Sequence, residues 1–169
     1  VTGMSNILGT VLPVREITAA AHAKGALVLV DACQMIVHQK VDVRDIGCDF
    51  LVFSGHKTYG PSGIGVLYGR YEILDSMPPY QFGGDMVDTV SYQHTTFEEP
   101  PARFEAGTPA IVQAVGLGRA LQYMSDLGMD NIEAHEVELV KYTNERLKEV
   151  KGLKVIGNAD NKGGVFSFN

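Results

Sequence analysis

The sequence has few cysteines and no pattern that would close a covalent framework. Cys33 and Cys48 are the only two, they do not form a CxxC pair, and the sequence contains no secretory signal pattern. We therefore expect no disulfides and a reducing, cytoplasmic location. The five histidines show neither HxxxH nor Cys-His ligand spacing, so no metal site is expected.

The sequence also lacks long apolar runs and clustered positive charge. No apolar segment approaches the roughly 20 residues of a bilayer span, which argues against a membrane partner. The net charge is −6 and the basic residues are scattered, which argues against nucleic acid. A small molecule is the predicted partner. The 169 residues suffice for one core, and the start on Val1 without a methionine indicates a piece of a longer protein.

The first half alternates helical spacing with short apolar runs. A helix is predicted from Pro13 to Gly25, the latter as its C-terminal cap. The runs ALVLVD (26–31) and FLVF (50–53) are typical of parallel strands buried on both faces. The run GIGVLYG (63–69) follows too closely for a helical crossover and is predicted to be antiparallel. This order predicts an α/β fold with a mostly parallel sheet flanked by helices.

The second half is predicted to contain a long loop and two helices. Residues 76–109 are rich in proline and glycine, and a loop of this length is usually functional or interfacial. Helical patterns follow at about 110–127 and 130–150. The domain prediction is a partial large domain over 1–128 and, over 129–169, a connecting helix with the first strands of a small C-terminal domain.

Polar side chains are predicted to converge where the strands end. The carboxyl ends of parallel strands share one edge of a sheet, and open α/β sheets bind ligands outside that edge. Three strands would end at Asn6, at Asp31 and at the segment from Ser54 to Lys57, with Gln34 close behind Asp31. We therefore expect an amide, a carboxylate and a lysine-bearing turn around one cavity.

The glycines around Lys57 do not match phosphate-binding motifs. A P-loop lysine follows its glycines, whereas Lys57 precedes Gly60, Gly63 and Gly65. A dinucleotide fingerprint fails because Tyr68 stands where the third glycine belongs. A lysine held by such a backbone and partly withdrawn from water can attack a carbonyl, which is Schiff-base chemistry. The alternative is a solvated surface charge.

Asp31 is the second half of this hypothesis. A carboxylate across the cavity from such a lysine would keep a pyridine nitrogen protonated. Two unit charges about 4 Å apart at an effective dielectric of about 20 interact by roughly 4 kcal/mol, equivalent to about three pKa units. The alternative is that Asp31 caps a helix or forms a turn.

Several segments resemble one enzyme family. The segment CDFLVFSGHKTYGPSGIGVLYG resembles the lysine signature of class V pyridoxal-phosphate enzymes, and VDACQ resembles their aspartate strand. Within that class, four segments are similar to Suf-type, or group II, cysteine desulfurases: SNILGTVLPV, KTYGPSGIGVLYG, FGGDMV and EEPPARFEAGTPA. The resemblance covers essentially the whole chain. It implies the fold-type I architecture of pyridoxal 5'-phosphate (PLP) dependent transferases and a homodimer.

The resemblance also implies an activity. The full-length enzyme would convert L-cysteine to L-alanine and pass the sulfur, as an enzyme persulfide, to a sulfur-acceptor or scaffold protein of the Suf system for iron-sulfur cluster assembly. Lys57 would form the Schiff base with PLP and move protons, and Asp31 would pair with the ring nitrogen. Gln34, with Asn6 nearby, would hydrogen-bond the ring phenolate oxygen or the substrate.

Four further residues are implied to bind the cofactor phosphate. Ser54 and His56 would hold it within one subunit. Gly107 and Thr108 would reach the phosphate of the neighbouring subunit, so the site would need a dimer. Arg103 also matches the family motif without an implied role, and an ion pair with Glu105 or another carboxylate is an equal alternative.

Neither cysteine is predicted to accept the sulfur. The family's persulfide cysteine is implied to lie on a loop beyond Asn169, and a thiol buried in a strand turn, as expected for Cys33, is a poor nucleophile. The 169 residues alone are therefore expected to be inactive. Two other readings stay open. One is a selenocysteine lyase or cysteine sulfinate lyase of the same class, and the other is a catalytically silent dimerisation or interaction module.

Overall fold

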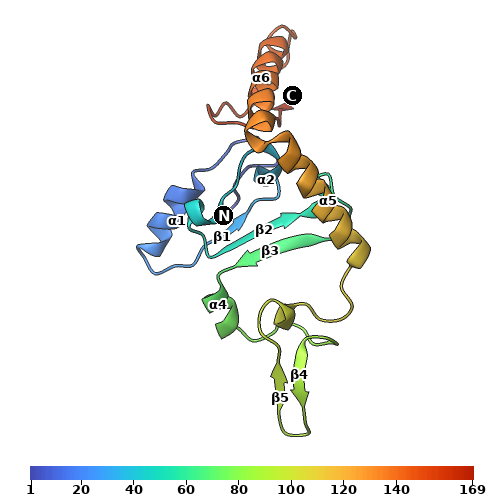
Figure 1. Cartoon of the computed structure of the whole chain (residues 1–169). Coiled ribbons are helices and arrows are strands. Elements are labelled where there is room, and N and C mark those ends of the chain that lie inside the picture. Colours follow the sequence, from blue (N-terminus) through green and yellow to red (C-terminus); the bar gives the residue numbers. More distant parts are fainter.

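A computed structural model describes the whole chain, residues 1–169. Its central sheet contains three strands in the order β1 (Leu29–Asp31), β2 (Phe50–Ser54) and β3 (Gly65–Gly69). β1 and β2 are parallel, and β2 and β3 are antiparallel over five paired positions (Figure 1). Both strand directions predicted from the sequence are confirmed. The sheet of this chain is mixed, with its parallel part in the β1–β2 pair.

β1 is shorter than predicted and is buried on one face only. The strand does not include Val28 because the Val28 N–H donates to the carboxylate of Asp49 at 2.7 Å instead of to a neighbouring strand. Val30 is fully buried, whereas Leu29 is 43% exposed. Successive residues of a strand point to opposite faces, and the core of this chain lies on one of them. The expectation of burial on both faces is therefore wrong for these residues.

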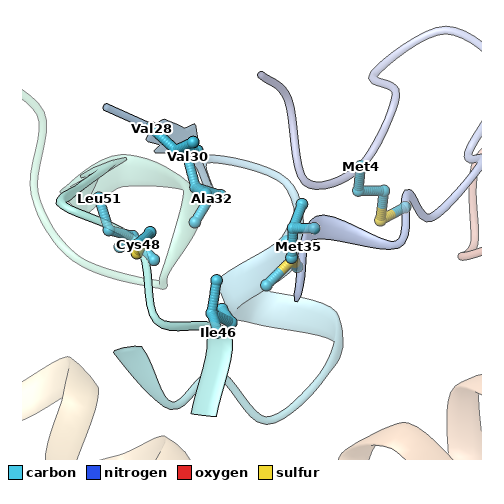
Figure 2. Packing of buried hydrophobic residues seen from close by; sticks show 9 residues of the cluster. Met4, Val28, Val30, Ala32, Met35, Ile46, Cys48 and Leu51 are labelled. Carbon is cyan, nitrogen blue, oxygen red and sulfur yellow. The ribbon is translucent and has the colours of Figure 1, made fainter. Parts of the chain in front are cut away.

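The core lies between the sheet and three short helices. These helices are α1 (Val14–His22), α2 (Met35–His38) and α3 (Val43–Ile46). Figure 2 shows the buried side chains gathered beneath β1. Each fully buried aliphatic or methionine side chain contributes about 1.5–3 kcal/mol. The cluster consists of Met4, Val14, Val28, Val30, Ala32, Met35, Ile46, Cys48 and Leu51.

The segment predicted as a long loop contains a hairpin. After α4 (Tyr71–Ser76), the chain forms β4 (Val87–Val90) and β5 (Thr95–Phe97), which pair antiparallel. In Figure 1 this hairpin projects from the lower end of the molecule, away from the sheet. The prediction of an unstructured loop over 76–109 is therefore wrong for these strands.

Arg103 links the chain just after β5 to α4 through hydrogen bonds. It lies in the 3-10 helix Ala102–Phe104. Its guanidinium donates to the Asp75 carbonyl at 2.7 Å and to the Glu98 carbonyl at 2.9 Å, and it lies 3.3 Å from the Asp75 carboxylate. The ion pair is formed with Asp75 and not with Glu105, which gives Arg103 a structural role in this chain.

Two long helices follow, as predicted. α5 (Ile111–Leu127) and α6 (Met129–Leu147) are separated by Gly128, whose φ is +84°. The chain then forms β6 (Val155–Ile156) and β7 (Ser167–Phe168), which pair antiparallel. A domain boundary near Gly128 stays a prediction. Neither long helix, nor any other, has the length and hydropathy needed to span a bilayer.

Candidate active site

The turn that carries Lys57 is closed by hydrogen bonds to one carbonyl. β2 runs directly into the 3-10 helix Gly55–Lys57. The Gly55 carbonyl accepts from the N–H groups of Thr58 and Gly60, each at 3.0 Å, and from the Thr58 hydroxyl at 2.9 Å. The Gly55 N–H donates to the Ile64 carbonyl at 2.9 Å. Because Thr58 is fully buried, these bonds are shielded from water and fix the turn.

Glycine is required where this turn packs against α5. A Cβ at Gly60 would lie 2.9 Å from the Gly55 carbonyl oxygen and 3.0 Å from Cδ1 of Leu117 on α5. Leu117 is itself buried, so neither neighbour can move without cost. The close approach of the backbone to itself and to α5 explains the glycine at position 60.

Lys57 and Asp31 line one small cavity at the carboxyl ends of β1 and β2. The cavity has a volume of about 130 Å³. The N-terminal segment reaches it because Thr2 forms a parallel bridge with Asp31 beside β1. The structure thus brings together four of the predicted site residues. The lining consists of Thr2, Met4, Asn6, Asp31, Cys33, Gln34 and Lys57.

Three lining residues were not among the predicted site residues: Thr2, Met4 and Cys33. The usable signal for Thr2 and Met4 was their place just before Asn6 in a segment predicted to end a strand at this edge, and for Cys33 it was its place between Asp31 and Gln34.

Asp31 is held in its ionised form by its surroundings. Its Oδ1 accepts from the Cys33 N–H at 2.9 Å. This bond, followed by the Cys33 thiol and the positive charge of Lys57, lowers the pKa of Asp31 by more than burial raises it. A carboxylate accepting backbone N–H bonds is stabilised in its charged form. The cavity therefore presents an anion and an amine together.

The remaining predicted residues lie outside the cavity lining. Ser54 is half-buried, and its Oγ lies 3.5 Å from Sγ of Cys33, so it adjoins the cavity. His56 is exposed one residue before Lys57. Gly107, with φ +85°, and Thr108 are in the segment leading to α5. Their predicted contact is with a neighbouring subunit, and it stays a prediction.

The two thiols have different environments. Cys48 is buried, and burial raises the pKa of its thiol. Cys33 is half-buried and not fully buried as expected, because it lines the cavity. No group of three or more His, Cys, Asp and Glu side chains is placed to hold a metal ion.

The side chains around the cavity fit PLP. A primary amine suits its aldehyde, a carboxylate suits its ring nitrogen, and amide side chains suit its phenolate oxygen. All three kinds of group line the cavity, in Lys57, Asp31 and the pair Asn6 and Gln34.

Known proteins resemble this chain over its full length. The family model for aminotransferase class-V matches residues 1–169. A cysteine desulfurase from Dickeya dadantii is 54% identical over 170 aligned positions, which cover 100% of this chain and 41% of that protein. The chain therefore spans about two-fifths of the length of the curated relatives it matches.

Solved structures share the fold. A cysteine desulfurase from Thermococcus onnurineus superposes with a TM-score of 0.94 at 42% identity, covering 99% of this chain and 42% of that one. A C-DES lysine mutant with glycine covalently linked to its PLP cofactor gives a TM-score of 0.87 at 25% identity, covering 99% and 45%. The architecture is thus that of fold-type I PLP enzymes, and the chain belongs to the aminotransferase class-V family, whose cofactor is PLP.

Proposed function

We propose that the full-length protein is a PLP-dependent cysteine desulfurase that converts L-cysteine to L-alanine. The observation that carries this proposal is the placement of Lys57 and Asp31 around one cavity at the strand ends. The relatives named cysteine desulfurase support the choice of substrate.

Four of the lining residues have a proposed role. Bound PLP supplies an aldehyde for amines and a ring that withdraws electrons. Lys57 holds the cofactor through its amine and later carries a proton to and from the substrate α-carbon. Asp31 accepts the N–H of the ring nitrogen, and at about 4 Å this charge pair is worth roughly 4 kcal/mol. Asn6 and Gln34 donate to the phenolate oxygen or the substrate.

The phosphate is proposed to be held by two subunits. Ser54 and His56, which flank Gly55 in the lysine turn, donate hydrogen bonds from one subunit. Gly107 and Thr108 bind the phosphate of the neighbouring subunit, so the functional unit is a homodimer. Support for this assignment comes from the position of Ser54 and His56 in the turn that also carries Lys57.

The finer assignment is to the Suf-type group. The protein would act in the cytoplasm, carry sulfur as a persulfide on a cysteine other than Cys33 and Cys48, and deliver it to a Suf acceptor or scaffold protein for iron-sulfur assembly. The 169 residues alone are expected to turn over no cysteine.

The decisive experiment traps the cofactor on Lys57. Full-length protein is loaded with PLP, reduced with borohydride and digested, and its peptides are weighed by mass spectrometry. We expect the cofactor mass on the peptide containing Lys57 in the wild type and its absence in Lys57→Ala. Lys40→Ala, an exposed lysine outside the cavity, is the matched control and should label normally.

The outcomes separate the competing functions. If the wild-type protein carries no label, the only remaining function is that of a catalytically silent dimerisation or interaction module. Labelled protein with a higher kcat/KM for selenocysteine or cysteine sulfinate than for cysteine would replace the desulfurase with the corresponding lyase.

A further inference from the structure

Cys33 lies between two residues with proposed cofactor contacts. Its N–H donates to Asp31 Oδ1 at 2.9 Å, and its Sγ lies 3.5 Å from Ser54 Oγ. It also lines the cavity that contains Lys57. The proposed function gives this residue no task.

The contact with Ser54 lies beyond the end of the parallel ladder. The register of β1 and β2 ends with the pair Asp31 and Val52, and the last backbone bond across this edge runs from the Ala32 N–H to the Val52 carbonyl at 2.9 Å. Past that bond the pairing of β1 with β2 ends, whereas β2 continues to Ser54, which pairs with Gly65 of β3. The thiol of Cys33, in the turn after β1, and the hydroxyl of Ser54, the last residue of β2, lie 3.5 Å apart beyond the end of this pairing.

We propose that Cys33 is a positioning residue that ties the end of β1 to the end of β2 and so sets Asp31 relative to Ser54. The proposal rests on the proposed function, because it assigns Asp31 to the ring nitrogen and Ser54 to the phosphate of one cofactor. The ring and its short phosphate arm limit the distance between these two groups of PLP to a narrow range. The residues that hold them must therefore lie within a matching range.

A thiol can link these neighbours, whereas a methyl group cannot. A cysteine S–H is a weak donor and its sulfur a weak acceptor, so the Cys33 side chain can hydrogen-bond the Ser54 hydroxyl while its backbone N–H donates to Asp31. The thiol also helps to lower the pKa of Asp31. An alanine at this position would keep the backbone bond to Asp31 but lose the link to Ser54. A serine would keep a side-chain donor and acceptor.

The test compares Cys33→Ala, Cys33→Ser and Cys48→Ala in the full-length enzyme. The dissociation constant of PLP is measured by titrating the apoenzyme, and the visible circular dichroism of bound PLP reports its orientation. We expect PLP to bind Cys33→Ala about two- to tenfold more weakly, as the loss of one hydrogen bond predicts, with an altered dichroism band. Cys33→Ser should restore both within about twofold. Cys48→Ala, buried away from the cavity, should lose stability without weakening PLP binding.

Two results would overturn the proposal. Wild-type PLP affinity and dichroism in Cys33→Ala would show that the side chain only fills space, and an equal defect in Cys33→Ser would show that its polarity is irrelevant. Should Cys33→Ala fail to fold, Cys33→Ser decides alone, since wild-type values support the link and weakened binding contradicts it. Failure of the proposed function would look different, because the wild type itself would then trap no cofactor on Lys57.

Discussion

Two aspartates at opposite ends of the parallel strand pair differ in how many of their hydrogen bonds are made within the chain. Asp49, just before β2, is 1% exposed and accepts from the Val28 N–H at 2.7 Å and from His22 at 2.8 Å. Arg70 lies 3.6 Å from it. Asp31, at the end of β1, lies on the exposed face and accepts one hydrogen bond, from its own turn. Only Asp31 keeps acceptor capacity for a ligand.

The direction of the pKa shift does not distinguish the two. Burial raises the pKa of Asp49, but the hydrogen bonds from His22 and Val28 and the charge of Arg70 outweigh it and leave a net lowering. The pKa of Asp31 is lowered mainly by a backbone N–H. Both carboxylates are ionised at neutral pH, and the difference lies in what else can still bind to them. Substitution of Asp31 should therefore lower activity with little change in stability, whereas substitution of Asp49 should lower stability with little change in PLP binding.

The largest expected effect follows from Asp31→Ala. Loss of a charge pair worth roughly 4 kcal/mol should lower kcat/KM for cysteine about a thousandfold in the full-length enzyme. The thermal unfolding midpoint of the apoenzyme should change little, because the Asp31 side chain accepts only one hydrogen bond, within its own turn. Steady-state kinetics and a thermal melt measure both, and Asp45→Ala, an exposed surface aspartate, is the control. A loss below tenfold would contradict the assigned role.

Asp49→Ala should lower the stability of the protein and leave PLP binding unchanged. It leaves the Val28 N–H without its acceptor in the core and removes the partner of His22 and Arg70, at a cost of about 3 kcal/mol. Denaturant unfolding of the full-length apoenzyme followed by circular dichroism measures the loss. The protein that remains folded should bind PLP with wild-type affinity. Weak PLP binding with normal stability would contradict the division between the two aspartates.

A smaller loss is expected for His22→Ala. The His22 side chain is about one-third exposed, so solvent competes for its bond to Asp49, and we expect about 1 kcal/mol of destabilisation. The Val28 bond should persist in this variant. A loss as large as that of Asp49→Ala, measured in the same denaturant series, would mean that the histidine and not the backbone bond accounts for the effect.

The smallest expected effect is a loss of unfolding free energy at acidic pH. Folding lowers the pKa of Asp49. The contribution of its carboxylate to the free energy of unfolding is therefore fully present above the ordinary aspartate pKa and is lost as pH falls below about 4. The wild type should therefore lose more unfolding free energy than Asp49→Asn between pH 5 and the lowest pH at which both stay folded. If the unfolding free energies of the wild type and Asp49→Asn fall in parallel as the pH is lowered, other carboxylates control the stability in acid.

Long periodic segments and strand direction could be predicted from the sequence, whereas short strands could not. α5 and α6 carry helical spacing over many turns, and the short connection to β3 leaves no room for a crossover helix. The hairpin of β4 and β5 was missed because proline and glycine surround it and its pattern is weak, with Val90 68% exposed. β1 is shorter than its apolar run because the Val28 N–H donates its hydrogen bond to the carboxylate of Asp49, which lies 21 residues further along the chain.

The convergence at the cavity was predictable, but its details were not. The rule that parallel strands share a carboxyl edge placed Lys57 and Asp31 together. The Cys33 contact with Ser54 depends on side-chain distances past the ladder, which no local pattern encodes. The roles of His56 and Thr108 stay predictions, because their proposed partners are a cofactor and a second subunit.

The unbroken pairing of β2 with β3 has a consequence for how this protein can change. Five consecutive positions pair without a shift, and sliding by one residue would turn every side chain of a strand to the opposite face. An inserted or deleted residue between Ser54 and Gly65 therefore cannot be absorbed by the strands and must be accommodated within the segment that carries Lys57. A change in the length of this segment would alter the surroundings of Lys57, and we expect that length to vary far less than that of the projecting hairpin.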